Sequence, residues 1–402
     1  MKKKYLAWII NGPDNIETIE AHKYILEKFS ENFDKMYFIN IKNLKLFNKQ
    51  LQKKPINQEY LPFNFIYFEP RSFFEFKNFL KDKKLIAVSN FGKDFEDLKK
   101  HLILNLLDIK FFQISNLGNL QWTHKAFQTK SILFKIYLKF IKFYSQKLIN
   151  FLSIVGLVPR IQIRFISNLD NFENMKKNKF KLLMKKFKLF YAKEHILVNS
   201  RTYDQFLDNQ SKISEDYIVL LDYDINHPDD ILSGANISAK NIEDHYNNLN
   251  LFLDNLSKKY NKKVIVSIHP RAKLSEKKKF FPKYDIFQFK TLDCIKKAFI
   301  VIFFDSSAII DAIILKKKII TLTSNNLARL ALDGSNKYSS TIGIYQEHLD
   351  TFDASKIVKI VEETEKRIQS YDQFIDRNII PAGKEAGEGY KKIINTVKER
   401  FF

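Results

Sequence analysis

Two short polar clusters follow apolar runs in the second half of this chain, and both have the residue types of a phosphate-binding site. In "VSIHPRA", His269 can donate a hydrogen bond to a phosphate oxygen, Pro270 fixes the turn and Arg271 supplies positive charge. In "FFDSSAIIDAIILKKK", Ser306 and Ser307 stand where a strand gives way to a helix, and free backbone N–H groups there suit an anion. A locally satisfied histidine and a simple serine helix cap are the structural alternatives.

Three aspartates are the candidate catalytic carboxylates. Asp222 and Asp224, in "LLDYDINHPDD", alternate along an expected strand, so their side chains point to the same side. Asp14, in "NGPDN", follows the first apolar run of the chain. A carboxylate in a cleft can deprotonate a hydroxyl group or stabilise a cationic transition state, and Asp222 is the first choice for that role. Capping of a loop or helix is the alternative for each aspartate.

Short apolar runs alternate with amphipathic segments along most of the chain. In the first half, strands are expected at 5–10, 35–41, 64–70, 84–90 and 109–115, and helices at 15–30, 72–82 and 93–107. In the second half, strands are expected at 195–200, 217–224, 262–270, 284–289, 299–305 and 318–324, and helices at 238–260, 291–298, 306–317, 354–376 and 386–402. The helix over 238–260 has Ser238 as its expected N-cap. This alternation predicts parallel sheets covered by helices on both faces.

The chain of 402 residues exceeds one typical hydrophobic core, which predicts two Rossmann-like α/β domains facing a cleft. The expected N-terminal domain covers residues 1–195 and the C-terminal domain residues 196–375, with a helix at 376–402 that packs back on the first domain. Ligands of such sheets bind outside the carboxyl ends of the strands, near the point where the strand order reverses. The polar clusters at the strand ends are therefore expected to converge on one edge of the second sheet.

The charge of the chain is strongly positive, with a formal net charge of +22. Lysines set among phenylalanines, leucines and isoleucines are concentrated in residues 125–190, which are expected to form basic amphipathic helices. Such helices can lie on an anionic membrane surface, and a buried helix with a wet lysine face is the competing interpretation. A general bias of residue usage toward Lys, Asn, Ile and Phe is a further source of the charge.

The remaining features concern the cellular compartment. One cysteine, Cys294, cannot form an internal disulfide, which fits a reducing environment. The apolar run near the N-terminus is too short for a signal peptide, and no run is long enough for a transmembrane helix. A cytoplasmic protein is expected, with peripheral attachment to the inner face of the membrane through residues 125–190.

Three segments together carry a resemblance to a known group of enzymes. "LLDYDINHPDD", "VSIHPRA" and "FFDSSAIIDAIILKKKIITLT", within residues 215–325, resemble bacterial surface-polysaccharide glycosyltransferases of GT-B type. Their His-Pro and Ser-Ser pairs are similar to those of sialyltransferase-like and Kdo-transferase-like enzymes. Lys318 stands where those enzymes usually have proline, and the first half of the chain has no matching motif.

The resemblance implies a metal-independent glycosyltransferase without a cofactor. Its C-terminal domain would bind the nucleotide sugar, with His269, Pro270 and Arg271 neutralising phosphate and Ser306 with Ser307 completing the phosphate site. The implied donor is a CMP-linked nonulosonic acid or Kdo-like sugar. The implied acceptor is a glycan or lipid-linked glycan of a capsule, lipopolysaccharide or lipooligosaccharide, bound by the N-terminal domain.

Two other classes of function remain open on the sequence. A transferase that moves a polyol phosphate from a CDP-glycerol-type donor would use the same phosphate-binding residues. A nucleic-acid-binding protein would account for the positive charge, but the chain has no RNP, KH or helix-turn-helix signature, so nucleic acid is not an expected partner.

Overall fold

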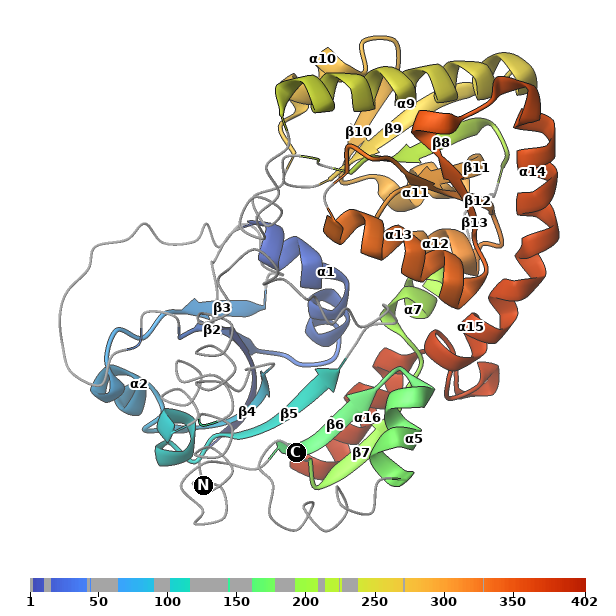
Figure 1. Ribbon diagram of the computed structural model, residues 1–402. Helices are drawn as coiled ribbons and strands as arrows, with labels where there is room; N and C mark the ends of the chain where they lie inside the picture. Colours follow the sequence, from blue (N-terminus) through green and yellow to red (C-terminus); the bar gives the residue numbers. More distant parts are fainter. Residues whose placement is uncertain are drawn as a thin grey trace. The chain divides into compact units, whose positions relative to one another are not determined.

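The computed structural model describes two compact α/β units (Figure 1). The described residues are 3–10, 16–41, 44, 64–89, 102–115, 144, 161–177, 192–208, 214–223, 225, 238–269, 272–327 and 329–402. Those in 1–118, 132–205 and 379–402 belong to the first unit, and those in 206–378 to the second. Four of the residues singled out in the sequence lie outside the described part: Asp14, Asp224, Pro270 and Arg271.

A seven-stranded parallel sheet forms the centre of the first unit. Its strand order is β3-β2-β1-β4-β5-β6-β7, and the order reverses between β1 and β4. The strands are β1 (Lys3–Ile10), β2 (Met36–Asn40), β3 (Phe65–Phe68), β4 (Lys83–Ser89), β5 (Lys110–Ser115), β6 (Ile161–Ile166) and β7 (Glu194–Leu197). The apolar runs at the start of the chain are therefore strands buried on both faces, as expected for a parallel sheet.

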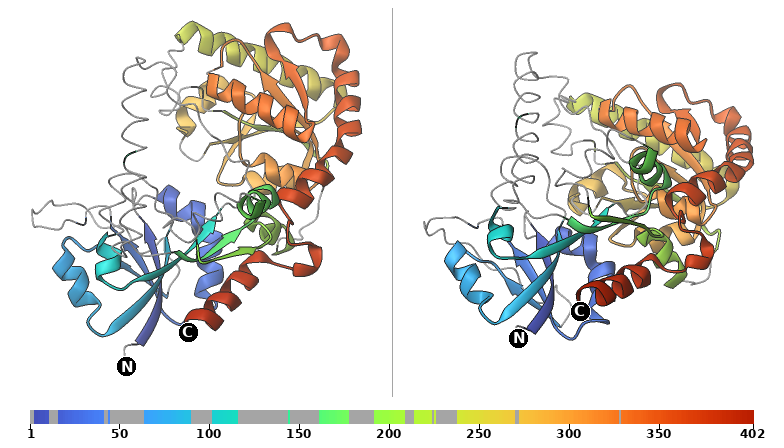
Figure 2. Two further views of the ribbon diagram at one scale, coloured as in Figure 1. Left: turned by 60° about the horizontal axis from the view of Figure 1, so that its bottom comes forward. Right: turned by 90° about the horizontal axis from the view of Figure 1, so that it is seen from below.

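Helices cover both faces of this first sheet. On one face, α1 (Ile16–Ser30) and the C-terminal helix α16 (Gly389–Phe401) pack side by side, as Figure 2 shows in blue and dark red. Trp8 of β1 contacts this layer through Phe29 of α1, with ring centroids 6.2 Å apart. On the opposite face lies α2 (Phe73–Phe79), capped by Ser72, whose hydroxyl accepts the backbone N–H of Glu75.

The last helix of the chain is tied firmly to the first unit. Asp204, in α7 (Arg201–Asp208), is buried, and its carboxylate accepts the backbone N–H groups of Gly389 and Tyr390 at 2.7 and 3.0 Å. A side chain at Gly389 would collide with the backbone carbonyl of Asn199, so only glycine fits there. Residues 379–402 thus return to the first unit, while α15 (Tyr371–Asn378) just before them belongs to the second.

Two segments of the first unit differ from the sequence-based expectation. Part of the region 125–190 forms strand β6 and helix α5 (Leu169–Lys177), whereas basic amphipathic helices were expected throughout. Most of that region lies outside the described residues. The run "HILVNS", assigned to the second domain on sequence, forms β7, which pairs with β6 at the edge of the first sheet. Strand order is a product of tertiary packing, and the alternating pattern carries no signal for which sheet a strand joins.

A six-stranded parallel sheet forms the centre of the second unit, with the order β10-β9-β8-β11-β12-β13. Its strands are β8 (Tyr217–Leu221), β9 (Lys263–Ile268), β10 (Asp285–Gln288), β11 (Ala298–Phe303), β12 (Lys318–Thr323) and β13 (Tyr345–His348). From β8 the chain builds outward through β9 and β10, and from β11 it builds in the other direction. The strand order therefore reverses between β8 and β11.

Helices also cover both faces of the second sheet. The long helix α9 (Ala239–Tyr260) and α14 (Ile357–Lys366) pack on one face, against Leu220, Val266 and Ile302 (Figure 1). Ser238 caps α9 by accepting the N–H of Asn241 at 3.2 Å, which confirms the expected cap. This unit also contains α10 (Leu274–Phe280), α11 (Thr291–Lys296), α12 (Ile309–Ile314) and α13 (Arg329–Ile342).

Within the described part of the chain, no helix is both long enough and apolar enough to cross a bilayer.

Candidate functional site

The carboxyl-end edge of the second sheet is the candidate functional site. All its strands run parallel, so their carboxyl ends lie along the same edge. Asp222, His269 and the Phe304–Ser307 turn follow β8, β9 and β11, and these three strands are direct neighbours. As expected, Asp222, His269, Ser306 and Ser307 follow strands that end at one edge, whereas Asp224, Pro270 and Arg271 lie outside the described residues. They also flank the reversal of strand order, where ligands of open α/β sheets bind.

Asp222 lies immediately after β8 and is held in a buried ion pair. Its carboxylate is 2.6 Å from Nζ of Lys277 in α10, and the two side chains are 0% and 4% exposed. Lys277 Nζ also donates to the hydroxyl of Tyr246 at 2.7 Å. Burial disfavours the charged form of Lys277, but the carboxylate and the hydroxyl outweigh it and hold the pKa of Lys277 above its usual value. Lys277 is therefore positively charged at neutral pH.

This environment differs from that expected of a catalytic base in a cleft. The Asp222 backbone N–H donates to Ser267 on the neighbouring strand at 2.9 Å, and its side chain faces inward to Lys277. Breaking such a pair leaves an uncompensated buried charge. The geometry therefore favours a positioning role, in which Asp222 fixes α10 and the turn before it against β8. Catalysis by Asp222, Asp224 or Asp14 stays a prediction.

His269 is exposed at the end of β9, and its backbone carbonyl oxygen is hydrogen-bonded. Its carbonyl oxygen accepts the N–H of Ala272 at 2.9 Å. The side-chain amide of Gln288, at the end of the neighbouring β10, donates to the carbonyl oxygens of Ala272 at 3.0 Å and His269 at 3.3 Å. The exposed side chain of His269 thus lies at the edge of the sheet, beside backbone carbonyl oxygens that are already hydrogen-bonded.

The two serines lie at the same edge but do not begin a helix. The helix α12 is only six residues long and starts at Ile309 after Ala308, whereas the sequence pattern places its start at Ser306. Ser306 is half-buried and its Oγ accepts the N–H of Ala308 at 3.4 Å, while Ser307 is exposed. The residues 304–308 therefore form a turn, and anion binding there would come from hydroxyl and turn N–H groups rather than from a helix end.

His245 is a buried residue at this edge that sequence reasoning did not single out. It is fully buried in α9, with its ring centroid 5.1 Å from that of Phe304. Neither ring nitrogen has a hydrogen-bond partner within the described residues. Burial, reinforced by the nearby charge of Lys277, lowers the pKa of His245 to about 4, so the ring is neutral at pH 7. Its position on the apolar stripe of a predicted helix was the available signal.

Asp305 is the second carboxylate beside the strand-order reversal. It is half-buried after β11, and Gly334 of α13 packs directly on it, because a Cβ at Gly334 would lie 2.5 Å from the carboxyl carbon. Ser335 fixes the same region by donating to the carbonyl oxygen of Phe304 at 2.6 Å. Asp305 is part of the sequence motif "FFDSSA", but the sequence does not show that its carboxylate is half-buried. Only the packing of α13 against it does so.

A pocket of about 420 Å³ opens at the carboxyl ends of β12 and β13. Its lining is mostly polar and includes Ser324, Asn325, Gln346, Glu347 and His348. Behind it, Asp350 accepts hydrogen bonds from the Ser324 hydroxyl and the Asn325 N–H, at 3.1 and 2.7 Å. Burial tends to raise the pKa of Asp350, but these hydrogen bonds hold it below its usual value. The loop after β12 is therefore fixed by an ionised carboxylate.

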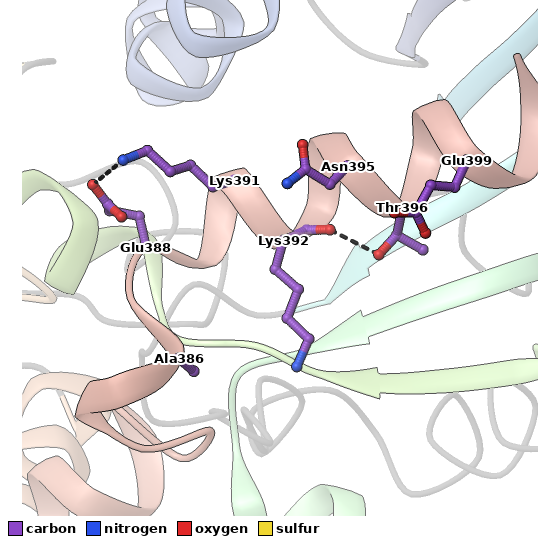
Figure 3. Close-up of a pocket in the computed structure, with 7 residues that line it drawn as sticks. All are labelled: Ala386, Glu388, Lys391, Lys392, Asn395, Thr396 and Glu399. Atoms are coloured by element: carbon purple, nitrogen blue, oxygen red, sulfur yellow. Dashed lines mark hydrogen bonds and ion pairs between the residues drawn. The ribbon is translucent and has the colours of Figure 1, made fainter.

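Other features of the described residues offer less to a ligand. A hollow of about 370 Å³ along α16 is open and shallow in chemistry, and two of its lining side chains, Glu388 and Lys391, already pair with each other at 2.7 Å (Figure 3). No group of three or more His, Cys, Asp or Glu side chains is arranged to hold a metal ion in the described ranges. The carboxyl-end edge of the second sheet therefore remains the candidate site, because it gathers polar side chains beside the reversal of strand order.

Comparison with solved structures defines the fold. The chain is similar to Phytolacca americana UGT2 complexed with UDP-2fluoro-glucose and pterostilbene, over 100% of both chains, with 9% identity and a TM-score of 0.51. It also matches the UDP-GlcNAc 2-epimerase of Methanocaldococcus jannaschii, over 99% of both chains, with 14% identity and a TM-score of 0.46. The wall teichoic acid polymerase TagF, soaked with CDPG, matches over 99% of this chain and 88% of its own, with 13% identity and a TM-score of 0.48.

Sequence comparison adds no relative, because no known protein family and no curated protein matches the chain. At identities this low, the structural likeness shows the fold alone. The chain has the GT-B fold, with two parallel-sheet α/β domains of seven and six strands. The expected fold class is confirmed.

Proposed function

We propose that this protein is a GT-B-type glycosyltransferase that binds a nucleotide-sugar donor at the carboxyl-end edge of its second sheet. The observation that carries the proposal is that Asp222, His269 and the Ser306 turn follow three adjacent strands beside the strand-order reversal. The donor is a CMP-linked sugar of the nonulosonic acid or Kdo-like class, as the His-Pro and Ser-Ser pairs imply. The acceptor is a surface glycan or its lipid-linked precursor.

The side chains divide the work according to their surroundings. His269, exposed in a fixed turn, donates to a phosphate oxygen, with Arg271 adding charge and the hydroxyls of Ser306 and Ser307 adding donors. The buried ion pair of Asp222 and Lys277 lies below these side chains and holds the end of β9 in place. Stabilisation of the leaving phosphate by such donors supplies the electrostatic part of catalysis without a metal ion.

Donor binding tests this proposal directly. Calorimetric titration with CMP, CDP, UDP and GDP is expected to show the tightest binding for CMP. His269→Ala is expected to weaken it at least 10-fold, because a hydrogen bond to a charged group contributes about 1.5–3 kcal/mol. Lys273→Ala, which removes an exposed charge close to the same turn, serves as the control and should change affinity little. Absence of nucleotide binding in the unaltered protein would overturn the proposal.

The same titration separates the competing donors. Preference for CDP together with transfer of glycerol phosphate from CDP-glycerol would identify a polyol-phosphate transferase, which uses the same phosphate chemistry. Undiminished sugar transfer in the presence of EDTA is the outcome expected for a metal-independent enzyme. Binding to heparin without binding to any nucleotide would instead indicate a nucleic-acid-type polyanion site.

The catalytic base is a separate question that three variants address. Asp14→Asn, Asp224→Asn and Asp305→Asn each remove a carboxylate while keeping its size. The variant that lacks the base is expected to lose turnover by orders of magnitude with little change in donor affinity. Turnover of Asp222→Asn is measured alongside these variants, at a temperature where it stays folded. A large loss of turnover in Asp222→Asn alone would identify Asp222 as the base.

Attachment to an anionic membrane is the remaining part of the proposal. The net charge of +22 and the need to meet a lipid-linked acceptor support it. The protein is expected to co-sediment with phosphatidylglycerol vesicles and to be released as the salt concentration rises. Equal binding to neutral phosphatidylcholine vesicles would contradict an electrostatic attachment.

A further inference from the structure

The amino-end edge of the first sheet gathers lysines. Three adjacent strands, β1, β4 and β5, begin with Lys3, Lys83 and Lys110. Strands β1 and β4 pair in register, which sets Lys3 opposite Lys83 and Lys4 opposite Lys84. Neighbouring strands lie about 4.8 Å apart, so each pair places two like-charged side chains next to each other. Sheet formation gives no reason for this arrangement, because neutral polar residues would avoid the repulsion.

The protein itself neutralises only part of this charge. The ammonium group of Lys83 lies 2.7 Å from the carboxylate of Asp82. Lys4 donates one long hydrogen bond, of 3.4 Å, to the main-chain oxygen of Phe402. Lys84 is half-buried and makes no hydrogen bond or ion pair with any described residue. Lys84 is therefore the lysine at this edge that folding explains least.

A pocket of about 520 Å³ opens at this edge. Lys4, Lys83 and Lys84 contribute to its lining, and Asp108 adds a carboxylate. Asp108 is exposed and forms no ion pair with a described lysine, so it does not neutralise them. Ammonium groups donate hydrogen bonds to phosphate oxygens, and a carboxylate accepts one from a hydroxyl group. The charged part of the pocket therefore suits a phosphate ester that also carries a hydroxyl group.

The rest of the pocket is apolar and comes from three parts of the first unit. Leu80 follows the last turn of α2, Leu85 belongs to β4, and Leu107 lies shortly before β5. Leu80 and Leu85 are buried, at 6% and 2% exposed. Leu106, next to Leu107 in the chain, is 67% exposed, so one more apolar side chain is available to a longer ligand. A short carbon chain attached to the phosphate can contact these leucines.

We propose that this pocket binds a phosphate ester of a small polyol, of which phosphoglycerol is the simplest. Lys84 and Lys4 donate to the phosphate oxygens, Asp108 accepts a hydrogen bond from a hydroxyl group, and the leucines contact the carbon chain. This group exists free, as glycerol 3-phosphate, and as the head group of phosphatidylglycerol. The inference does not rest on the proposed function, because the donor site is assigned to the second sheet.

Calorimetric titration with glycerol 3-phosphate tests the pocket. The double variant Lys4→Gln with Lys84→Gln is expected to weaken binding about 10-fold or more, because two charge-assisted hydrogen bonds are lost. The matched control is Lys278→Gln with Lys279→Gln, which removes two exposed charges from α10 and changes the net charge equally. The control is expected to stay within about 2-fold of the unaltered protein, because solvent screens charges that do not touch the ligand.

The melting temperature separates a role in binding from a role in folding. Lys84→Gln removes one of two like charges that face each other in register, so this variant is expected to melt at the same or a slightly higher temperature. It should nevertheless bind glycerol 3-phosphate several-fold more weakly. Lys84→Arg keeps the positive charge and is expected to retain affinity within about 3-fold. A lower melting temperature for Lys84→Gln would assign Lys84 to folding and overturn the proposal.

Vesicles distinguish the two sources of the ligand. If the lipid head group is the ligand, co-sedimentation with phosphatidylglycerol vesicles should fall in the double variant and in Leu106→Ser, while Leu106→Ser still binds glycerol 3-phosphate. If the free ester is the ligand, the double variant should lose glycerol 3-phosphate and co-sediment as the unaltered protein does. Both results support the pocket, and each identifies one source.

Three results would overturn the proposal. The double variant could bind both glycerol 3-phosphate and the vesicles as the unaltered protein does, or the control pair could lose as much affinity, which would indicate a general effect of net charge. The unaltered protein could also bind neither ligand. Nucleotide affinity is expected to be the same in the double variant and the unaltered protein, so failure of this pocket and failure of the donor site appear in different titrations.

Discussion

The two ends of the second sheet differ in how completely their buried polar groups are matched with hydrogen-bond partners. At the amino end, Lys317 is 5% exposed and its ammonium donates to three backbone carbonyls, those of Ser214, Lys296 and Ala298, at 2.9, 3.0 and 2.7 Å. Burial lowers the pKa of Lys317. All three hydrogens of the ammonium group are matched with acceptors, as expected of a group whose only task is to hold strands together.

At the carboxyl end, the polar groups are less completely matched. His245 has no partner for either ring nitrogen within the described residues, and Phe289 keeps a strained backbone at the surface. Asp222 and Lys277 satisfy each other, but they do so as charges buried beneath exposed turns. Both of these features cost stability, and both lie at the carboxyl end of the sheet. Functional sites commonly retain such local conflicts, which supports the carboxyl end as the site.

The largest expected effect comes from breaking the buried pair at the carboxyl end. Asp222→Asn leaves the ammonium of Lys277 buried without its counter-charge, and the free energy of unfolding should fall by about 3–5 kcal/mol. Urea denaturation followed by circular dichroism measures it. The double variant Asp222→Leu with Lys277→Met should recover most of the loss, since no unpaired charge remains.

An exposed ion pair in the same unit provides the control for that measurement. Lys283 and Asp254 lie 2.8 Å apart, with the lysine side chain 69% exposed. Lys283→Met should change stability by less than about 1 kcal/mol, because solvent screens the pair. A similar effect for the buried and exposed pairs would mean that Asp222 and Lys277 are not buried together in solution.

A smaller effect is expected from acid titration of His245. Its folded pKa of about 4 lies below the ordinary value of 6.5, so the unfolded chain binds the proton more readily between these values. Stability should therefore fall as the pH is lowered from about 6.5 to about 4, by about 3 kcal/mol in total. His245→Phe removes this titration and should flatten the dependence in that window. Asp350, whose folded pKa is lowered, loses its contribution only below that window.

At the amino end, Lys317→Met tests the fully matched lysine. Removal of the ammonium takes one donor away from each of three backbone carbonyl oxygens, of which that of Lys296 still accepts the N–H of Ser214, and the expected loss is about 2 kcal/mol. The measurement is again urea denaturation, and nucleotide affinity should stay unchanged because the site is at the other end of the sheet. Weakened nucleotide binding in folded Lys317→Met would contradict the separation of the two ends.

The smallest effect on stability is expected for Ser306→Ala. Its hydroxyl accepts one long hydrogen bond, 3.4 Å from the Ala308 nitrogen, so stability should change by less than about 0.5 kcal/mol. CMP affinity should still fall several-fold if the hydroxyl donates to phosphate. Ser355→Ala, at an exposed serine far along the chain, is the control for the loss of a surface hydroxyl.

Local pattern was sufficient to predict the elements and the edge of the sheet on which the site lies. The alternation of apolar runs and amphipathic segments predicts parallel strands, because a strand buried on both faces is apolar throughout. Ser238 was recognisable as a helix cap because capping depends only on residues close together in the sequence. Polar residues at successive strand ends share one edge in any parallel sheet, so His269 and Ser306 were placed together without knowledge of the packing.

Tertiary structure alone decided what each polar residue does at that edge. Lys277 stands among lysines of equal appearance in "SEKKKFF", and only the packing of α10 brings it to Asp222. The expected strand over 284–289 ends at Gln288, because the side-chain amide of Gln288 bonds the His269 turn and Phe289 is turned outward. Sequence periodicity reports which face of an element is apolar. Burial, ion pairing and backbone strain depend on contacts between residues distant in sequence, and those contacts arise only when the sheet and its helices pack.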